Sequence, residues 1–429
     1  MTTTTPIEGN LIEQPPFELL LGQRTRSVAS NFDFITTYAD FADVFEMPRQ
    51  IHEWVAVQMI ASVINGKVRI PWGAATYSLD LWVLLLSASG QGRNTTTDVA
   101  LEVLDAAEIT ELLRRTTWGS PAAFYQQVAE HPHGLYVWPE FSVVMRTLSD
   151  PRFAGVKEWI TDRYDNLRVP DSVAYRTTGK KSDTPPIEFT ESPRINILAT
   201  SSIDWFVNSL EQADTTGGFV PRWLPKQVGK PDRLIPKPKP TNQELVPVLT
   251  ERLKSISNLK GDADLAEIED LFDTWYTDTH GRFYSQSNVS LAAPFFNRLR
   301  AEVLKLAVVY EVSESGQLQV TERAFARAVD AASDAEKTIF ELLRTGMNRE
   351  GSELEKMAEK IRASGEKGVS KTELTRAFQH VKSRDRDDRL RTLIESGRIR
   401  MAKRETSGRP AHSYIDASYP AVSLSAHEE

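Results

Sequence analysis

The sequence contains no cysteine among its 429 residues. A disulfide framework and a metal site built from thiolates are therefore both excluded. Long apolar runs are also lacking, since the longest, Leu81–Leu86, is far shorter than the roughly 20 residues that cross a bilayer. The first residues, MTTTTPIEGN, have neither the basic nor the apolar segment of a secretory signal. We therefore expect a cytoplasmic protein without a membrane span.

Histidine is scarce, with seven in the chain. His131 and His133 in the stretch EHPHG have a spacing that occurs in metal sites, but no third ligand accompanies them. We interpret them as an ordinary pair in a loop and expect no structural metal.

The charge is unevenly distributed along the chain. The net charge is −8, yet the segment from Lys367 to Pro410 holds 13 basic and 6 acidic residues, which leaves −15 for the rest. An acidic body with a basic C-terminal module is typical of a protein that binds a polyanion at one end. A solvated helical module of mixed charge is the alternative interpretation.

Three apolar segments predict buried strands of a parallel sheet. They are LWVLLL at 81–86, GLYVW at 134–138 and RINILATSS at 194–202. Segments with helical spacing precede or separate these strands, at residues 51–66, 96–113, 121–131 and 142–165. The alternation of strands and helices indicates an α/β core, which we assign to residues 28–224.

The remaining segments differ from this core in composition. Residues 223–242, WLPKQVGKPDRLIPKPKPTN, are rich in Pro and Lys and cannot form a helix interior. We predict these parts in chain order: a flexible arm (1–27), the core (28–224), an extended connector (225–242), a helical domain (243–348), a linker that could also be helical (349–366), a winged-helix domain (367–416) and a tail (417–429).

The C-terminal module has the order helix, helix and hairpin. VSKTELTRAF predicts a short helix, with Ser370 as N-cap and Glu373 as its capping-box partner. DDRLRTLIESG predicts a second helix, and RIRMAKRETSGRPAHSYI predicts two strands around a turn. Its basic residues would contact DNA phosphates: Arg389, Arg391, Arg398, Arg400, Lys403, Arg404 and Arg409. A winged helix used for protein contacts alone is the alternative.

A phosphate-binding loop is suggested after the first strand. Such a loop needs glycines, a Lys for the β- and γ-phosphates and a hydroxyl for Mg²⁺. In LWVLLLSASGQGRNTTTD, an Arg stands in place of the Lys and an Asn in place of the hydroxyl residue. The candidate nucleotide-binding residues are Ser89, Gly90, Gln91, Gly92, Arg93, Asn94 and Thr95. An ordinary turn between strand and helix is the alternative.

Three further residues could take part in the chemistry. Glu140 follows the strand GLYVW and could polarise water, although Pro139 stands where a metal-binding Asp is expected. Thr200 ends the strand NILATSS and could sense the γ-phosphate. Arg222, in GGFVPRW, could complete a neighbouring subunit's site as an arginine finger. A surface ion pair is the alternative for Arg222.

The order of these motifs resembles one family: P-loop ATPases of prophages, plasmids and integrative elements, often described as helicase-like and commonly found behind a primase domain. GSPAAF, LYVWPE, NILATSS, GGFVPRW and NRLRAEVLKLA carry the resemblance, over about residues 30–345. It implies a RecA/AAA+-like parallel sheet with a helical domain and a winged helix. It also implies ATP with Mg²⁺, a homo-oligomeric ring on DNA, and a separate primase or replication protein as a partner.

Departures from the family pattern leave two hypotheses open. Arg93, Asn94 and Pro139 all stand in place of residues expected to bind phosphate or metal, and each weakens that binding. The planar guanidinium of Arg93 is also bulkier than the ammonium that it replaces. The first hypothesis is an active helicase-like ATPase. The second is a DNA-binding scaffold or regulatory protein that keeps the fold without hydrolysis.

A basic turn, AYRTTGKKSD (174–183), lies between two predicted strands. In a ring it could face the pore and follow a DNA backbone through Arg176, Lys180 and Lys181. An ordinary surface hairpin is the alternative.

Overall fold

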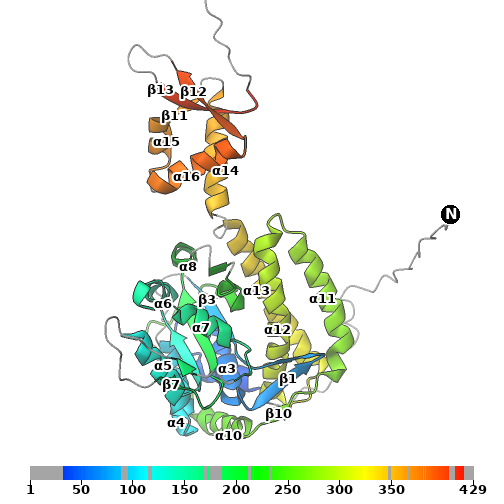
Figure 1. The fold of residues 1–429 in the computed structure, drawn as a ribbon. Helices are drawn as coiled ribbons and strands as arrows, with labels where there is room; N and C mark the ends of the chain where they lie inside the picture. The colour runs from blue at the N-terminus through cyan, green and yellow to red at the C-terminus, as the bar shows by residue number, and fades with distance from the viewer. Residues whose placement is uncertain are drawn as a thin grey trace, which may run out of the picture. The chain divides into compact units, whose positions relative to one another are not determined.

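The chain divides into two compact units, Met1–Leu343 and Arg344–Glu429 (Figure 1). A computed structural model describes residues 32–87, 95–114, 118–153, 155–168, 172–173, 186–210, 214–215, 217–231, 233–345, 349–365, 368–379, 381, 383–404 and 411–419. Across these residues, no helix combines the length and the apolar character that crossing a bilayer requires.

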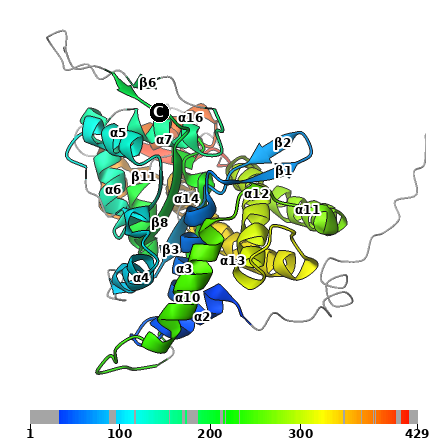
Figure 2. The ribbon, with the colours of Figure 1, turned by 90° about the horizontal axis from the view of Figure 1, so that it is seen from below.

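The first unit is built on a five-stranded sheet in which every strand pair is parallel. The strands lie in the spatial order β4 (Leu113–Arg114), β5 (His133–Trp138), β8 (Arg194–Ser201), β3 (Trp82–Leu86) and β9 (Trp223–Gln227). Every residue of β3 and β8 is buried. Helices lie on both faces of the sheet (Figure 2), which explains why its central strands are apolar throughout. The predicted α/β core with a parallel sheet is confirmed.

The helices of the sheet unit join or cover the strands. They are α2 (Phe34–Ala42), α3 (Arg49–Ile64), α4 (Thr95–Ala106), α5 (Pro121–Glu130), α6 (Phe141–Leu148), α7 (Val156–Arg163) and α8 (Ile203–Ser209). Two predicted helices were too long. The helix predicted at 96–113 ends at Ala106, and Glu108 adopts a positive φ of 63°. The helix predicted at 142–165 is broken around Gly155, whose φ of 89° is left-handed.

The edge strand β9 corrects one predicted boundary. Residues 225–227, assigned to the connector, belong to this strand, and Lys226 is buried within it. Helix α13 (Glu322–Thr345) covers the free edge: the Gln227 backbone N–H donates to the Thr338 hydroxyl at 3.4 Å, and Lys226 pairs with Asp334. The sheet is thereby protected from pairing with another strand.

The described residues of the segment predicted to be helical, 243–348, form four α-helices. They are α10 (Val246–Ser257), α11 (Glu269–Tyr284), α12 (Val289–Glu314) and α13, and nearly all of this segment falls within the same compact unit as the sheet. Two small sheets complete the unit. One contains β10 (Gly261–Asp262), β1 (Val68–Trp72) and β2 (Ala75–Tyr77), and the other pairs β6 (Ser172–Val173) with β7 (Ile187–Glu188).

The second unit contains α14 (Arg349–Ala363), β11 (Val369–Ser370), α15 (Lys371–Ala377), α16 (Ser383–Glu395), β12 (Ile399–Arg404) and β13 (Ala411–Asp416). Its strands form an antiparallel sheet in the order β11, β13, β12. For residues 349–366 the sequence left a linker and a helix open, and the structure shows a helix over Arg349–Ala363. Helix α14 contributes Met357 and Ile361 to a buried cluster with Leu374 and Leu393. The predicted capping box of Ser370 and Glu373 is present.

Candidate functional site

The ends of three strands are hydrogen-bonded to one another at the carboxyl edge of the parallel sheet. Because β8 lies between β3 and β5, its last residues face the ends of both neighbours. The Ser87 backbone N–H donates to the Ser201 carbonyl at 3.0 Å, and the Thr200 hydroxyl donates to the Pro139 carbonyl at 2.5 Å. The order of the strands therefore gathers three of the predicted motifs at one edge.

The connections between strands also change the direction in which they cross the sheet at this point. After β3 the chain crosses to β4 on one side, whereas after β8 it crosses to β9 on the other side of β3. In open α/β sheets, ligands bind outside the carboxyl ends of strands where such a reversal occurs. The ends of β3 and β8 are therefore where a ligand is expected.

The predicted phosphate loop leads away from β3 at this edge. Residues 88–94 lie outside the described residues, so the structure gives no account of Ser89, Gly90, Gln91, Gly92, Arg93 or Asn94. Thr95 is the first residue of α4, a helix of 12 residues. The N-terminus of a helix carries a positive partial charge that favours phosphate. Strand and helix thus flank the loop as the motif requires.

The groups around the loop can be compared with the needs of ATP and Mg²⁺. The Ser201 hydroxyl is fully buried and has no hydrogen-bond partner among the described residues, so an incoming acceptor could use it. Glu140 and Pro139 are both exposed at the start of α6. The described part of the chain contains no group of three or more His, Asp or Glu side chains placed to hold a metal. Hydroxyls and the Glu140 carboxylate suit phosphate oxygens and a hydrated magnesium ion.

Arg222 lies at the opposite, amino edge of the sheet. Thr200 is level with Leu85 and therefore with Lys226, four residues after Arg222, which places Arg222 about 13 Å away along the strand direction. Its Nη1 donates to the Gly218 carbonyl at 2.5 Å. Burial, together with repulsion from Arg298, lowers the pKa of Arg222 to about 10. The structure thus separates Arg222 from Thr200 and Glu140 within one chain.

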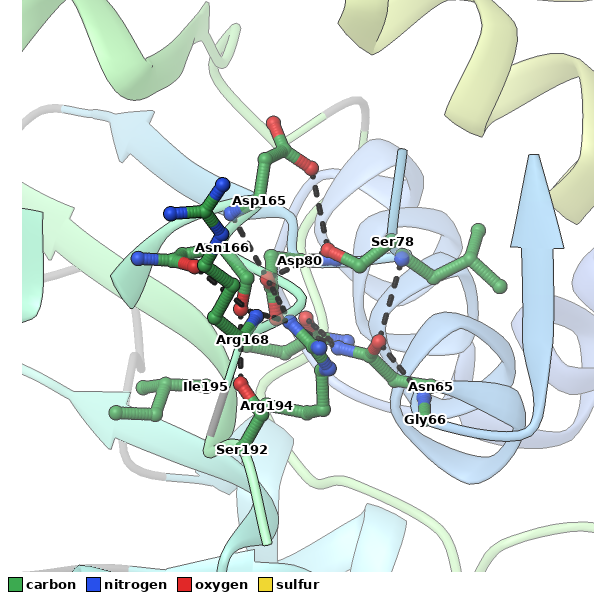
Figure 3. Close-up of polar contacts among 12 residues, drawn as sticks. Asn65, Gly66, Ser78, Asp80, Asp165, Asn166, Arg168, Ser192, Arg194 and Ile195 are labelled. Atoms are coloured by element: carbon green, nitrogen blue, oxygen red, sulfur yellow. Dashed lines mark hydrogen bonds and ion pairs between the residues drawn. The ribbon is translucent and has the colours of Figure 1, made fainter. Parts of the chain in front are cut away.

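A buried polar network occupies the amino edge (Figure 3). Its centre is Asp80, which is 1% exposed. The Asp80 carboxylate accepts hydrogen bonds from the Ser78 hydroxyl at 2.6 Å, the Asn65 amide at 2.9 Å and the Asp165 backbone N–H at 3.1 Å. The Arg194 guanidinium lies 3.4 Å from the same carboxylate. Asp80 therefore joins the ends of α3 and α7 to the first residues of β3 and β8.

Helix α12 adds two buried charged groups to this network. The Lys305 ammonium donates to the Asp80 carbonyl at 2.7 Å and lies 3.0 Å from Asp165 and 3.4 Å from Glu302. Burial favours the neutral amine, but the surrounding carboxylates prevail and raise the pKa of Lys305. Glu302 accepts a hydrogen bond from the Tyr164 hydroxyl, and burial raises its pKa to about 7.

The amino-edge network was not predicted from the sequence. One signal was available, since Lys305 stands between two leucines in the motif NRLRAEVLKLA. A charged side chain in an apolar helix face is rarely buried without partners. The partners, Asp80 and Asp165, lie 225 and 140 residues earlier in the chain. Because these groups mainly satisfy one another, we interpret the network as a clamp between α12 and the sheet.

The predicted DNA-binding residues are only partly described. Arg391 lies 3.4 Å from Asp388, and Arg400 donates to the Tyr419 carbonyl at 3.1 Å. Arg389 is half-buried in α16, and Arg398 precedes β12. The side chains of Lys403 and Arg404 and the whole of Arg409 lie outside the described residues, as do Arg176, Lys180 and Lys181 between β6 and β7.

No protein-family model matches the chain, and a search of curated proteins finds no significantly similar sequence. The function is therefore argued from the residues and their geometry.

Proposed function

We propose that the protein is a helicase-like P-loop ATPase that acts on DNA in the replication or maintenance of a phage, plasmid or integrative element. One observation carries the proposal: β8 lies between β3 and β5, so that Ser87, Thr200 and Glu140 lie at or just after the carboxyl ends of three neighbouring strands. The connections that follow β3 and β8 cross the sheet in opposite directions at this point. The proposal includes a cytoplasmic location, a homo-oligomeric ring and a separate primase or replication protein as a partner.

In this proposal the nucleotide phosphates lie at the start of α4. Backbone N–H groups of residues 88–94 would cradle the phosphates, with Arg93 in place of the usual Lys and Asn94 or Thr95 near the metal. Mg²⁺, when bound, would supply charge stabilisation of the phosphoryl oxygens. Glu140 would orient and polarise the attacking water from the end of β5.

Arg222 can serve this chemistry in one way alone. Its place at the amino edge prevents it from reaching the phosphates of its own chain. In a ring, it would instead approach the site of a neighbouring subunit as an arginine finger. The aromatic ring of Tyr164, with its centre 5.8 Å from the Arg222 guanidinium, would help to hold that side chain.

The second unit is the proposed DNA-binding part. The order of α15, α16, β12 and β13 supports a winged helix, and the segment from Lys367 to Pro410 carries the excess of positive charge. In this proposal Arg398 and Arg400, beside the hairpin, contact phosphates. The affinity for DNA should therefore fall steeply with rising salt and vary little with DNA sequence.

A specific contact favours a second candidate, a DNA-binding scaffold or regulatory protein that keeps the fold without hydrolysis. The Thr200 hydroxyl, which should sense phosphate, instead donates to the carbonyl of Pro139, and that proline occupies the position of the expected aspartate. Two groups of the catalytic edge therefore engage each other.

ATP binding and hydrolysis by the purified chain, with and without single-stranded DNA, separate the two candidates. Arg93→Ala removes the charge proposed to hold phosphate, and Arg152→Ala, at a side chain that is 80% exposed, is the matched control. DNA-stimulated turnover that is lost in Arg93→Ala alone supports the ATPase. DNA binding without turnover supports the scaffold, and a chain that binds neither nucleotide nor DNA refutes both.

A further inference from the structure

An extended basic segment connects β9 to the turn before α10. This arm, residues 228–240 with the sequence VGKPDRLIPKPKP, holds four prolines and four basic residues against one acidic residue. Lys230, Lys237 and Lys239 are exposed, and the side chain of Leu234 is 83% exposed. An apolar residue so fully exposed, surrounded by lysines, is a feature of a contact surface.

The arm is held in a defined position on its own chain. Arg233 pairs with the Asp43 carboxylate at 2.6 Å, and the Ile235 backbone N–H donates to Glu46 at 3.3 Å. Next to the arm, the Thr241 hydroxyl donates to Glu102 at 2.7 Å. The lysines of the arm have no acidic partner among the described residues. Their charges are therefore available to another molecule, at little cost in ordering the backbone.

An acidic face lies elsewhere on the same unit. Between residues 261 and 273, GDADLAEIEDLFD, the chain has six acidic residues and no basic one. All six side chains are exposed, in β10, the turn after it and the first turns of α11: Asp262, Asp264, Glu267, Glu269, Asp270 and Asp273.

The arm and the acidic face of one chain are kept apart by α10. This helix of 12 residues, about 18 Å long, separates them in sequence. Figure 2 places the green loop of the arm and α11 on opposite sides of the unit. Because the arm is anchored, it cannot reach the acidic face of its own chain.

We propose that the arm docks on the acidic face of a second copy of this chain. The charges are complementary, and the first unit as a whole holds 33 basic and 45 acidic residues. Leu234 and the prolines favour a protein surface over a phosphate backbone. Two different patches in contact form a head-to-tail interface, which gives a closed ring when the rotation between copies closes. The inference rests on the homo-oligomer of the proposed function and does not depend on nucleotide or DNA binding.

Molar mass in solution, measured by light scattering on the full chain, tests this interface. The arm variant Lys237→Glu/Lys239→Glu and the face variant Asp270→Lys/Asp273→Lys each place like charges in contact. Each is expected to shift the wild-type oligomer to the 48.3 kDa monomer. The chain carrying all four substitutions restores opposite charges and should recover the mass of the oligomer. Lys356→Glu/Lys360→Glu, in α14, is the control and should leave the mass unchanged.

Three outcomes overturn the inference. An arm variant that keeps the wild-type mass refutes the arm as the interface, while the ring itself stands. A wild-type chain that is monomeric at tens of micromolar refutes both the interface and the ring. An arm variant with unchanged mass and at least about tenfold weaker DNA binding assigns the arm to DNA instead. Nucleotide binding, measured on the same samples, reports on the proposed ATPase site separately.

Discussion

The two edges of the parallel sheet differ in how they use polar groups. The amino edge concentrates buried charges, with Asp80, Arg194 and Lys305 each no more than 5% exposed. The carboxyl edge, where we place the nucleotide, has hydroxyls, the exposed Glu140 and a single buried cation among the described strand residues, Lys226, which pairs with Asp334. The buried charges of the amino edge thus lie where helix α12 packs against the sheet.

The difference has a physical reason. Buried charges need partners close by, and partners that neutralise one another have little capacity left for a ligand. A phosphate site, in contrast, can rely on backbone N–H groups and a helix N-terminus, which do not appear as charges in the sequence. A perturbed pKa, such as that of Glu302, therefore marks the clamp in this protein more clearly than the proposed reaction centre.

The strongest test of the clamp is Lys305→Met. It leaves Asp165 and Glu302 buried without their cation, so the free energy of unfolding should fall by about 3–5 kcal/mol. Urea unfolding followed by tryptophan fluorescence measures this, because all nine tryptophans precede residue 276 and report on the first unit. Lys337→Met, in an exposed pair with Asp334, is the control and should change stability by less than about 1 kcal/mol. Equal effects of the two substitutions would contradict the clamp.

The next effect concerns pH. The pKa of Glu302 is about 7 in the folded chain against 4.5 for a free glutamate, so the folded state binds the extra proton. The contribution of this group to stability is therefore present below pH 4.5 and declines by roughly 3 kcal/mol as the pH rises through 7. Relative to Glu302→Gln, the wild type should lose stability between pH 5 and 7.5 in the same urea assay. Parallel pH profiles for the two chains would show that burial does not raise this pKa.

At the carboxyl edge, Pro139→Asp should produce a gain. A carboxylate at the end of β5 would add the missing anchor for Mg²⁺ beside Glu140. Pro139 is exposed, so the substitution should fold, and kcat for ATP should rise at least about tenfold, or about 1.4 kcal/mol. Ser149→Asp adds a carboxylate after α6 and should leave kcat unchanged. If turnover is absent in both variants, the scaffold candidate is favoured.

The smallest effect is expected for Thr200→Val. The lost hydroxyl joins β8 to the Pro139 carbonyl, so the free energy of unfolding should fall by about 1 kcal/mol. Ser142→Ala removes a buried hydroxyl that has no partner among the described residues and should have little effect. If the folded Thr200→Val protein also binds nucleotide more weakly than the wild type, this hydroxyl contacts phosphate as well.

Local patterns predicted most elements of the fold. The apolar strands 81–86, 134–138 and 194–202, the helical character of the segment after the connector and the Ser370 capping box all follow from short-range periodicity and capping chemistry. Errors occurred where a helix ended without a strong signal, as at Ala106. For α14, whose sequence is rich in charged residues, the pattern left a helix and a linker open.

The proposed site was predicted in part. The carboxyl ends of parallel strands share an edge, so the positions of Ser87, Thr200 and Glu140 could be anticipated as a group. Arg222 is separated from them because it directly precedes β9 and therefore lies at the amino end of that strand. Its motif alone did not predict this position.

Composition and periodicity were enough to establish an α/β core, a series of helices after it and a basic C-terminal module, because these properties depend on neighbouring residues. The order of the strands in the sheet and the pairing of distant side chains could be learned only from the tertiary structure. The placement of β8 between β3 and β5, and the meeting of Lys305 with Asp80 across 225 residues, arise from packing and charge neutralisation between distant segments. Such long-range pairing leaves no periodic signal in one sequence, since each partner is an ordinary residue until the fold brings the other beside it.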